Sequence, residues 1–246
     1  MSKILCEKSG RLYCDKRRVL NVVTVEIQNG APTVDANTEL TGQNNTPQVK
    51  TARIRGYLFF KRFFDIVCSL IAGVILLLPM LVIAVIIRID SNGTALFRQE
   101  RLGLNGKTFM IVKFRSMRPD AEADGPKWAD KDDARCTRVG RVLRASRLDE
   151  LPQLWNIFIG NMSFVGPRPE REYFYDKFEE TVPGFRKRLT VKPGLTGLAQ
   201  VNGGYDLNPE EKLKYDLAYI HTRSVMLDLK CMLKTVKLIF SHEGAR

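Results

Sequence analysis

The sequence predicts a mixed α/β fold that is mostly helical, in which an apolar segment enters a membrane and a compact domain follows it. Residues 66–87 form an uncharged run of 22 residues, nearly all apolar, which is long for the core helix of a soluble domain. After this run, short apolar segments separated by turn residues are typical of short strands. Towards the C-terminus, apolar residues recur at helical spacing and predict longer helices.

Residues 1–52 are expected to form an N-terminal extension that ends in a flexible linker. The stretch from Val19 to Ile27 alternates apolar residues and can form a strand, although few neighbouring segments could pair with it. Residues 28–50 are polar and have little to bury, which indicates a linker. Residues 1–18 are too charged for a signal peptide. A small docking element and a dispensable tail are both compatible with this extension.

The apolar run lies between two basic segments. Residues 53–62 before it carry four cations without one acid, interleaved with phenylalanines, and this composition suits a membrane interface. At ~1.5 Å per residue the run is about 33 Å long, which is enough to cross a bilayer. The second flank is also basic, so the positive-inside bias assigns neither end to the outside. The preceding cations are Arg53, Arg55, Lys61 and Arg62.

Pro79 lies near the middle of this run and removes one helical hydrogen bond. Two arrangements therefore remain open from the residues alone. The run can form a single span, or a helix broken at Pro79 that enters and leaves by the cytosolic leaflet.

Charge and cysteine usage limit the class of partner and the compartment. The chain has 39 basic and 27 acidic side chains, a formal net charge of +12, which suits anionic partners such as lipid head groups, nucleotides or nucleic acid. Its five cysteines are scattered without metal-binding spacing, so we expect reduced thiols in the cytosol. His221 and His242 have no evident partner, which argues against a histidine-based triad and against a zinc site.

The domain after residue 90 is expected to begin with two short extended segments around a Gly103–Gly106 turn. Residues 190–204 are rich in glycine and proline, which favours a loop whose backbone can approach a ligand closely. The extended segments are 95–99 and 108–114, and the helices are 152–159, 170–178, 209–220 and 225–240.

The last of these helices has an apolar face with lysines between its members. We expect this face to pack on the core, with contact to a membrane as the alternative. The face comprises Met226, Leu229, Met232, Leu233, Val236, Ile239 and Phe240.

Asp149 and Glu150 form an acidic pair between basic clusters. Pro152 favours a helix that starts directly after the acids, and Gly160 favours its end. A helix N-terminus carries partial positive charge and suits phosphate. Carboxylates that act as a nucleophile or magnesium ligand, beside arginines that bind phosphate, indicate phosphoryl transfer, whereas simple helix capping is the alternative. The flanking cations are Arg141, Arg144 and Arg147 before the pair and Arg168, in a Pro-Arg-Pro turn, after it.

Several motifs follow one another from about Lys61 to the end of the chain. They are KRFFD before the apolar run, FRQERLGLNGKTFMIVKFRSM, DDARCTRVGRVLR, LDELPQLWN, MSFVGPRPE, VKPGLTGLAQVNG and YDLAYI. In this order they resemble the bacterial sugar transferases, also called monotopic phosphoglycosyl transferases, which start exopolysaccharide, capsule or O-antigen synthesis. Two departures, Arg147 where many members have Ser and Asn161 where Asp is frequent, bear on sugar specificity more than on the chemistry.

The resemblance implies that a UDP-sugar donates its sugar 1-phosphate to undecaprenyl phosphate and releases UMP. By this analogy Asp149 attacks the β-phosphorus, forms a covalent intermediate and also approaches Mg²⁺, the implied cofactor. Glu150 would assist by positioning or by handling a proton. The residues expected to bind phosphate are Arg144 and Arg168, followed by Lys113 and Arg115.

The resemblance also implies where the parts lie. Residues 53–90 would form a re-entrant membrane hairpin bent at Pro79, and residues 91–246 a compact cytosolic catalytic domain with interfacial helices at the bacterial inner membrane. The expected partners are the UDP-sugar, undecaprenyl phosphate and the cytosolic leaflet, without nucleic acid, and a homo-oligomer stays open. Glucose or galactose is favoured over an N-acetylated sugar through the resemblance alone.

Three other interpretations account for parts of the sequence. A membrane-anchored basic module that binds nucleic acid would explain the net charge, but no recognised binding motif supports it. A single-span protein with a partner-docking domain predicts that Asp149 is dispensable. A multi-span transferase without a covalent intermediate needs more apolar runs than the one this chain offers.

Overall fold

The computed structural model describes residues 27–28, 31–32, 48–123, 125, 133–204 and 206–241, with side chains described between residues 54 and 239 of these ranges. Ile27–Gln28 (β1) and Ala31–Pro32 (β2) pair antiparallel and belong to a separate unit, residues 1–33. The rest of the strand expected at Val19–Ile27, and residues 33–47 of the expected linker, lie outside the described residues. The linker expected to reach residue 50 ends earlier, because a helix already begins at Gln48.

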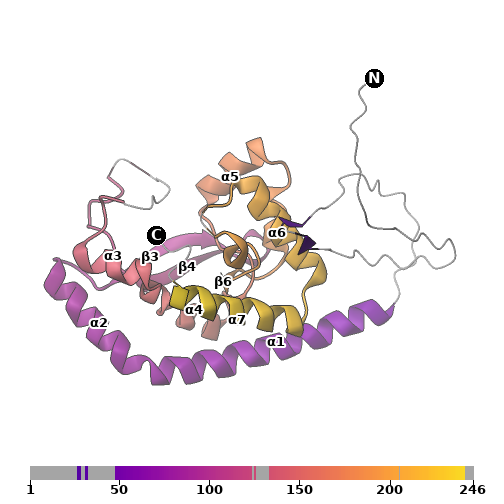
Figure 1. Ribbon diagram of the computed structural model, residues 1–246, viewed down its shortest axis with the longest axis horizontal. Coiled ribbons are helices and arrows are strands. Elements are labelled where there is room, and N and C mark those ends of the chain that lie inside the picture. The colour runs from indigo at the N-terminus through magenta and orange to yellow at the C-terminus, as the bar shows by residue number, and fades with distance from the viewer. Residues whose placement is uncertain are drawn as a thin grey trace. The chain divides into compact units, whose positions relative to one another are not determined.

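Gln48–Ile75 (α1) and Leu77–Asp90 (α2) form a bent pair along one side of the domain (Figure 1). Within the described ranges, no helix by itself has both the length and the apolar character needed to cross a membrane. Ile54–Ile75 and Leu77–Asp90 meet that requirement only together, and they are bent by 60°. The apolar run therefore does not form one straight span in this structure.

The bend lies at Leu76. The sequence predicts the break at Pro79, three residues later. Proline has no N–H, and its ring conflicts with the carbonyl group four residues earlier, which here belongs to Ile75. The helix therefore opens on the N-terminal side of the proline. Pro79 itself lies in the first turn of α2, where a backbone N–H is not needed.

The next two elements form a hairpin. Leu96–Leu102 (β3) pairs antiparallel with Thr108–Phe114 (β4) around the short turn Leu104–Gly106 (η1). This confirms both extended segments, although β3 begins one residue later and ends three residues later than expected. In strands, side chains two positions apart share a face, so Gln99 and Arg101 of β3 point to the same side of the hairpin.

The remaining elements form a compact, mostly helical domain. The helices expected at 152–159, 170–178, 209–220 and 225–240 are all present, with small shifts at their ends. Gly160 ends one of them in a left-handed conformation with φ 94°. The elements are Arg138–Ala145 (α3), Leu148–Glu150 (η2), Gln153–Ile159 (α4), Ser163–Val165 (β5), Glu172–Thr181 (α5), Phe185–Thr190 (η3), Gly194–Thr196 (β6), Gln200–Asn202 (η4), Pro209–Thr222 (α6) and Val225–Ser241 (α7).

The glycine-rich loop 190–204 uses its glycines for strand packing. β5 and β6 are parallel, and Ser163 pairs with Gly194. A Cβ atom on Gly194 would lie 2.1 Å from the backbone nitrogen of Gly166, and a Cβ on Gly166 would lie 2.4 Å from the carbonyl oxygen of Lys192. Such distances exclude any side chain, so both glycines are required by the close approach of two backbones rather than by a ligand.

Polar contacts join α1 to the domain. Arg62 donates hydrogen bonds to the carbonyl groups of Ile157 and Phe158 at 2.7 Å, and so caps the C-terminus of α4. Asp65, buried on α1, accepts from the hydroxyl of Ser163 at 3.1 Å and from the backbone of Phe164 at 3.0 Å. The helix that follows the acidic pair is therefore held directly by the bent helix pair, and Figure 1 shows α4 lying against α1.

Most of the apolar face expected to pack α7 on the core is exposed, so that expectation is wrong for most of its members. Met226, Leu233 and Val236 are 62%, 70% and 51% exposed, respectively. A different face of α7 packs inward through Cys231 and the partly buried Leu227 and Leu238. The sequence pattern did not identify this inward face, because the face also carries the polar Asp228. Hydrogen bonds to the Asp228 carboxylate offset the cost of burying it.

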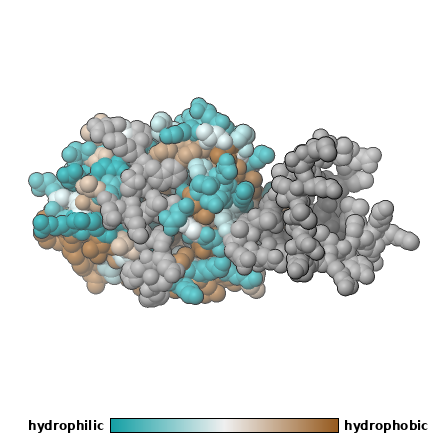
Figure 2. All heavy atoms as spheres, turned by 45° about the horizontal axis from the view of Figure 1, so that its top comes forward, coloured by the Kyte–Doolittle hydropathy of each residue, from teal (hydrophilic) through white to brown (hydrophobic). Residues whose placement is uncertain are grey.

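Exposed apolar side chains gather on the helices at one margin of the molecule. Figure 2 shows hydrophobic residues at the lower left of the molecule, directly below a band of hydrophilic residues. On α1 and α2 the exposed apolar residues include Phe59, Phe63, Val74, Leu78 and Ile89.

Candidate active site

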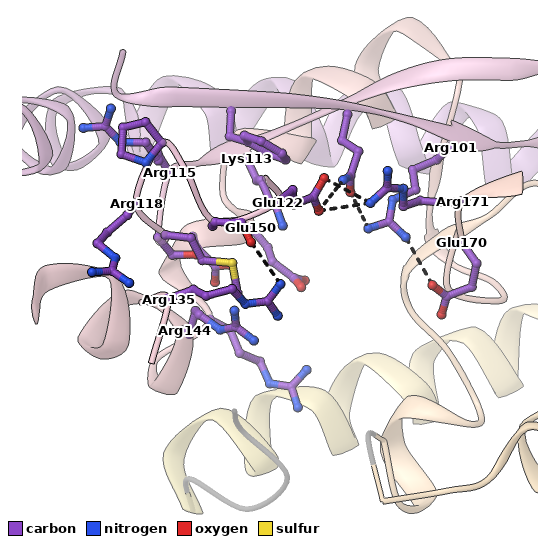
Figure 3. A pocket seen from close by; sticks show the side chains of 18 of the residues that line it. Arg101, Lys113, Arg115, Arg118, Glu122, Arg135, Arg144, Glu150, Glu170 and Arg171 are labelled. Atoms are coloured by element: carbon purple, nitrogen blue, oxygen red, sulfur yellow. Dashed lines mark hydrogen bonds and ion pairs between the residues drawn. The ribbon is translucent and has the colours of Figure 1, made fainter. Parts of the chain in front are cut away.

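A cavity of about 410 Å³ lies beside the β3–β4 hairpin, bounded by α3, η2 and the start of α5. In Figure 3, Arg115 and Arg118 lie towards one end, Arg101, Glu170 and Arg171 towards the other, and Lys113 and Glu150 between them. Nine basic and four acidic side chains line it, so the cavity is suited to a polyanion. The cations are Arg101, Lys113, Arg115, Arg118, Arg135, Arg144, Arg147, Arg168 and Arg171, and the acids are Glu122, Asp149, Glu150 and Glu170.

Local chain geometry brings Asp149 into this cavity. Gly140 of α3 packs so closely on the end of the hairpin that a Cβ there would lie 1.9 Å from the carbonyl oxygen of Ser116. Arg147 then takes a left-handed conformation with φ 58° and turns the chain from α3 into η2. Such a conformation is uncommon for a residue other than glycine and often marks a functional site. The turn leaves Asp149 only 8% exposed, beside the cavity.

Three of the four cavity acids have an arginine partner. Glu150 accepts from Arg168 at 2.6 Å, Glu170 from Arg101 at 3.1 Å, and Glu122 from Arg171 at 3.0 Å. Asp149 differs, since no hydrogen bond or ion pair to its carboxylate is found among the residues described here. Its oxygens are therefore available to a ligand.

The two adjacent acids have opposite protonation tendencies. Burial raises the pKa of Asp149 to about 6, and the neighbouring Glu150 carboxylate adds to the effect, while Lys113, Arg168 and Arg144 oppose it. Burial alone would also raise the pKa of Glu150, but the Arg168 guanidinium, together with Arg147 and Lys113, outweighs it and holds that pKa below its usual range. Paired titratable groups whose environments separate their pKa values are typical of catalytic sites.

Lys113 is the cation on β4 that faces the acids. Burial lowers the pKa of its ammonium group to about 8, Arg101 adds to the effect, and Asp149 opposes it. Its ammonium group also lies 5.2 Å from the centre of the Phe97 ring. A negative group beside Lys113, such as a bound phosphate, would therefore favour its charged form.

The structure brings together all six residues that the sequence analysis named for catalysis and phosphate binding, since Asp149, Glu150, Arg144, Arg168, Lys113 and Arg115 line the one cavity. The guanidinium of Arg115 also has a structural role. It donates to the backbone carbonyls of Ser91 and Asn92 at 2.7 and 2.8 Å, and so holds the end of α2 against the hairpin.

Four cavity cations were missed by the sequence analysis: Arg101, Arg118, Arg135 and Arg171. Arg101 lies two positions after Gln99 on β3, but the strand expected at 95–99 stopped short of it. Arg135 is oriented by Asp133, which accepts from its Nε at 2.8 Å and from its Nη2 at 2.6 Å. That pair lies within the DDARCTRVGRVLR motif, but only the fold shows that it reaches the cavity.

The donor groups fit a magnesium ion that is held partly by a substrate. Within the described ranges, no cluster of three or more metal-binding side chains is present. Mg²⁺ in proteins is often bound through one or two carboxylates and completed by substrate phosphates. Asp149, whose carboxylate faces the cavity, is the protein ligand that suits this arrangement.

Comparison with known proteins points to one family. The family model of the bacterial sugar transferases matches residues 56–242, a range that includes the bent helix pair from Gly56 and every residue of the cavity.

Three curated relatives agree with this match. An Aeromonas hydrophila UDP-N-acetylgalactosamine-undecaprenyl-phosphate N-acetylgalactosaminephosphotransferase is 41% identical over 193 residues, covering 77% of this chain and 46% of the relative. UDP-glucose:undecaprenyl-phosphate glucose-1-phosphate transferases of Klebsiella pneumoniae and Caulobacter vibrioides are 40% and 41% identical, covering 76% and 75% of this chain. The chain spans 42% of the Klebsiella relative and 71% of the Caulobacter relative.

Proposed function

Because the chain belongs to the bacterial sugar transferase family, we propose that it transfers a sugar 1-phosphate from a UDP-sugar to undecaprenyl phosphate, releasing UMP. The observation that carries this proposal is the cavity itself, where one carboxylate without a protein partner among the described residues lies among nine cations. Such a site suits a diphosphate donor and a phosphate acceptor in turn.

The proposed reaction has two halves. An oxygen of Asp149 attacks the β-phosphorus, the bond from this phosphorus to the bridging oxygen breaks, and UMP leaves with that oxygen. A phosphate oxygen of undecaprenyl phosphate then attacks the same phosphorus and displaces the Asp149 carboxylate. A covalent intermediate divides one difficult transfer into two steps and lets a water-soluble donor and a lipid acceptor use one site.

The neighbouring residues have distinct proposed roles. Arg168 neutralises Glu150 and lies where it can also bind a phosphoryl oxygen, and Arg144 and Lys113 supply further positive charge. Glu150 stays ionised beside Arg168 and positions that guanidinium. When bound by Asp149 and the donor phosphates, Mg²⁺ would neutralise charge that builds up on phosphate oxygens.

The location follows from the same proposal. We place the exposed apolar residues of α1 and α2 in the membrane, with the 60° bend allowing the pair to enter and leave by the cytosolic leaflet. The relatives' names refer to undecaprenyl phosphate, a lipid, so an acceptor phosphate would lie at the same surface. The first membrane step of polysaccharide synthesis at the bacterial inner membrane is the role that fits.

The hairpin predicts the same side for both of its ends. In a background with the native cysteines replaced by serine, Asn45→Cys and Thr94→Cys are both expected to be shielded from a membrane-impermeant thiol reagent added to intact cells. Both should react once the cells are permeabilised, which serves as the control. Labelling of either position from outside would rule out the hairpin and favour a single span.

The pH dependence of the first half-reaction tests the environment of Asp149. An attacking carboxylate must be ionised, so kcat/KM for UMP release should fall as the pH drops through about 6. Lys113 lowers the pKa of Asp149, so Lys113→Gln should move this midpoint to higher pH. Pre-steady-state rates from pH 5 to 8 would measure the shift. An unchanged midpoint would show that Lys113 does not influence the pKa of Asp149.

The sugar is the open part of the proposal, since the relatives' names include both glucose and N-acetylgalactosamine. Purified protein with Mg²⁺ and undecaprenyl phosphate should release UMP from one or a few members of a panel of UDP-sugars. No UMP from any of them would contradict the proposed function. The competing idea of a membrane-anchored module that binds nucleic acid or a protein partner is disfavoured by the family match and by the acids within the basic cavity.

A further inference from the structure

Arg168 lies on a segment without regular secondary structure, residues 166–171, between β5 and α5. Its guanidinium must nevertheless meet Glu150 at 2.6 Å. Prolines on both sides of Arg168 restrict φ but supply no N–H groups, so residues 167–170 are held largely through their carbonyl oxygens.

Each of four consecutive carbonyl groups in this segment accepts a hydrogen bond. The backbone N–H groups of Gly194 and Leu102 donate to the outer two carbonyl groups, at 2.9 and 3.0 Å. Arginine side chains donate to the inner two. The carbonyl of Arg168 itself is bound by Nη2 of Arg188, at 3.0 Å. The carbonyls belong to Pro167, Arg168, Pro169 and Glu170, and the donors are Gly194, Arg188, Arg101 and Leu102 in that order.

Arg188 is itself fixed deep in the domain. It is 2% exposed, and its Nε donates to Oδ2 of Asp216 on α6 at 2.6 Å. Its guanidinium lies 4.6 Å from the centre of the Phe185 ring and 5.7 Å from that of Tyr175. Asp216 is 1% exposed, so both charges of this pair are removed from water.

A buried ion pair of this kind is weak evidence for stability. Replacing both partners with apolar residues of similar volume is often neutral or stabilising, because the desolvation cost of two charges is avoided. A requirement other than stability would therefore explain why charges occupy this position. The bond from Arg188 to the Arg168 carbonyl supplies such a requirement, since an apolar pair could not make it.

We propose that the Arg188–Asp216 ion pair positions Arg168, and through it Glu150, for the chemical step. This inference rests on the proposed function. Asp216 orients and neutralises Arg188, Arg188 fixes the Arg168 peptide, and the Arg168 side chain reaches the cavity. Arg188 touches neither Asp149 nor Glu150 directly, so it is a positioning residue and acts on turnover rather than on donor binding.

The test replaces the pair as a unit, Arg188→Met with Asp216→Leu, so that neither member of the pair is left without the other. The melting temperature is expected to stay the same or rise, while kcat for UMP release falls on the order of 10²-fold, as when a catalytic group is misplaced by about 1 Å. KM for the UDP-sugar should change little. Arg186→Met is the matched control, because Arg186 lies on the same element η3 but pairs with the exposed Asp176 outside the cavity.

A double-mutant cycle separates positioning from a general structural effect. If the pair acts through Arg168, its replacement in an Arg168→Ala background should cause almost no further loss of kcat, because the side chain it positions is absent. An additive loss would overturn the proposal. So would unchanged kcat in the pair variant when the wild-type protein is active.

Hydrogen exchange supplies a readout that needs no activity. The backbone amides of Gly166, Arg168, Glu170 and Arg171 should exchange faster in the pair variant than in the wild type or in Arg186→Met. Unchanged exchange there would contradict the proposed restraint even if the enzyme works. A wild-type protein that releases no UMP, with the expected change in exchange, would count against the proposed function while the restraint itself held.

Discussion

Asp149→Asn is expected to lower UMP release by at least about 10³-fold, the scale of loss seen when a covalent nucleophile is removed. Asparagine keeps the shape of the side chain but is too weak a nucleophile to form the phosphoryl bond. The same variant should no longer become labelled by a UDP-sugar carrying radioactive β-phosphorus. Denaturing gel autoradiography after a short reaction without acceptor would measure this.

The effect of this substitution on stability has the opposite sign. The pKa of Asp149 is raised from 3.8 to about 6 in the folded protein, so the folded state binds the proton more tightly than the unfolded state. Stability therefore declines as the pH rises through this window, and the ionised carboxylate is unfavourable at pH 7. Asp149→Asn should keep or raise the melting temperature at pH 7, which distinguishes lost chemistry from lost folding.

Asp176→Asn provides the matched control, because Asp176 is an exposed acid whose partner is Arg186, outside the cavity. It should keep wild-type turnover. Wild-type turnover in Asp149→Asn, or continued labelling of that variant, would refute the covalent mechanism while leaving the family assignment intact.

Arg168→Ala is expected to lower kcat by about 10²- to 10³-fold, the loss typical of removing one preorganised electrostatic contact. The substitution removes a charge that would bind the transferring phosphoryl group and leaves Glu150 without its cation. Arg168→Lys should recover only part of the rate, because a lysine donates from one point and lacks the planar guanidinium.

The stability of Arg168→Ala has a defined pH dependence. Arg168 lowers the pKa of Glu150 in the folded state, so this contact stabilises the protein above the unfolded pKa of 4.5 and the benefit disappears as the pH falls through the lower folded value. The variant should therefore lose stability at pH 7 and lose much less in acid. Thermal melts from pH 3 to 8 would measure the difference.

Arg138→Ala controls for net charge. Arg138 lies exposed on α3, does not line the cavity, and its removal lowers the charge of the chain by the same amount. If Arg138→Ala slowed UMP release as much as Arg168→Ala, general electrostatic attraction of the donor would replace the specific role of Arg168.

Local sequence signals predicted the β3–β4 hairpin and the helices α4 to α7, because local chemistry decides them. Pro152 and Gly160 determine where α4 begins and ends, and Gly160 takes the left-handed conformation that glycine tolerates. The strands of the hairpin followed from apolar segments on either side of a turn. Where two signals competed, the sequence was less reliable, as for α7, whose visibly apolar face proved to be exposed and whose inward face carries Asp228.

By itself, the sequence determined the basic flanks, the proline-interrupted apolar run and the adjacent acids between arginines, since each depends only on neighbours along the chain. Tertiary structure alone decided that Asp149 lacks an ionic partner among the described residues while Glu150 has one, and that Arg135 and Arg171 join the cavity. The same holds for Arg188, which meets the Arg168 carbonyl 20 residues away in sequence. Desolvation and charge pairing depend on what lies within a few ångströms in space, and only the packed fold establishes those distances.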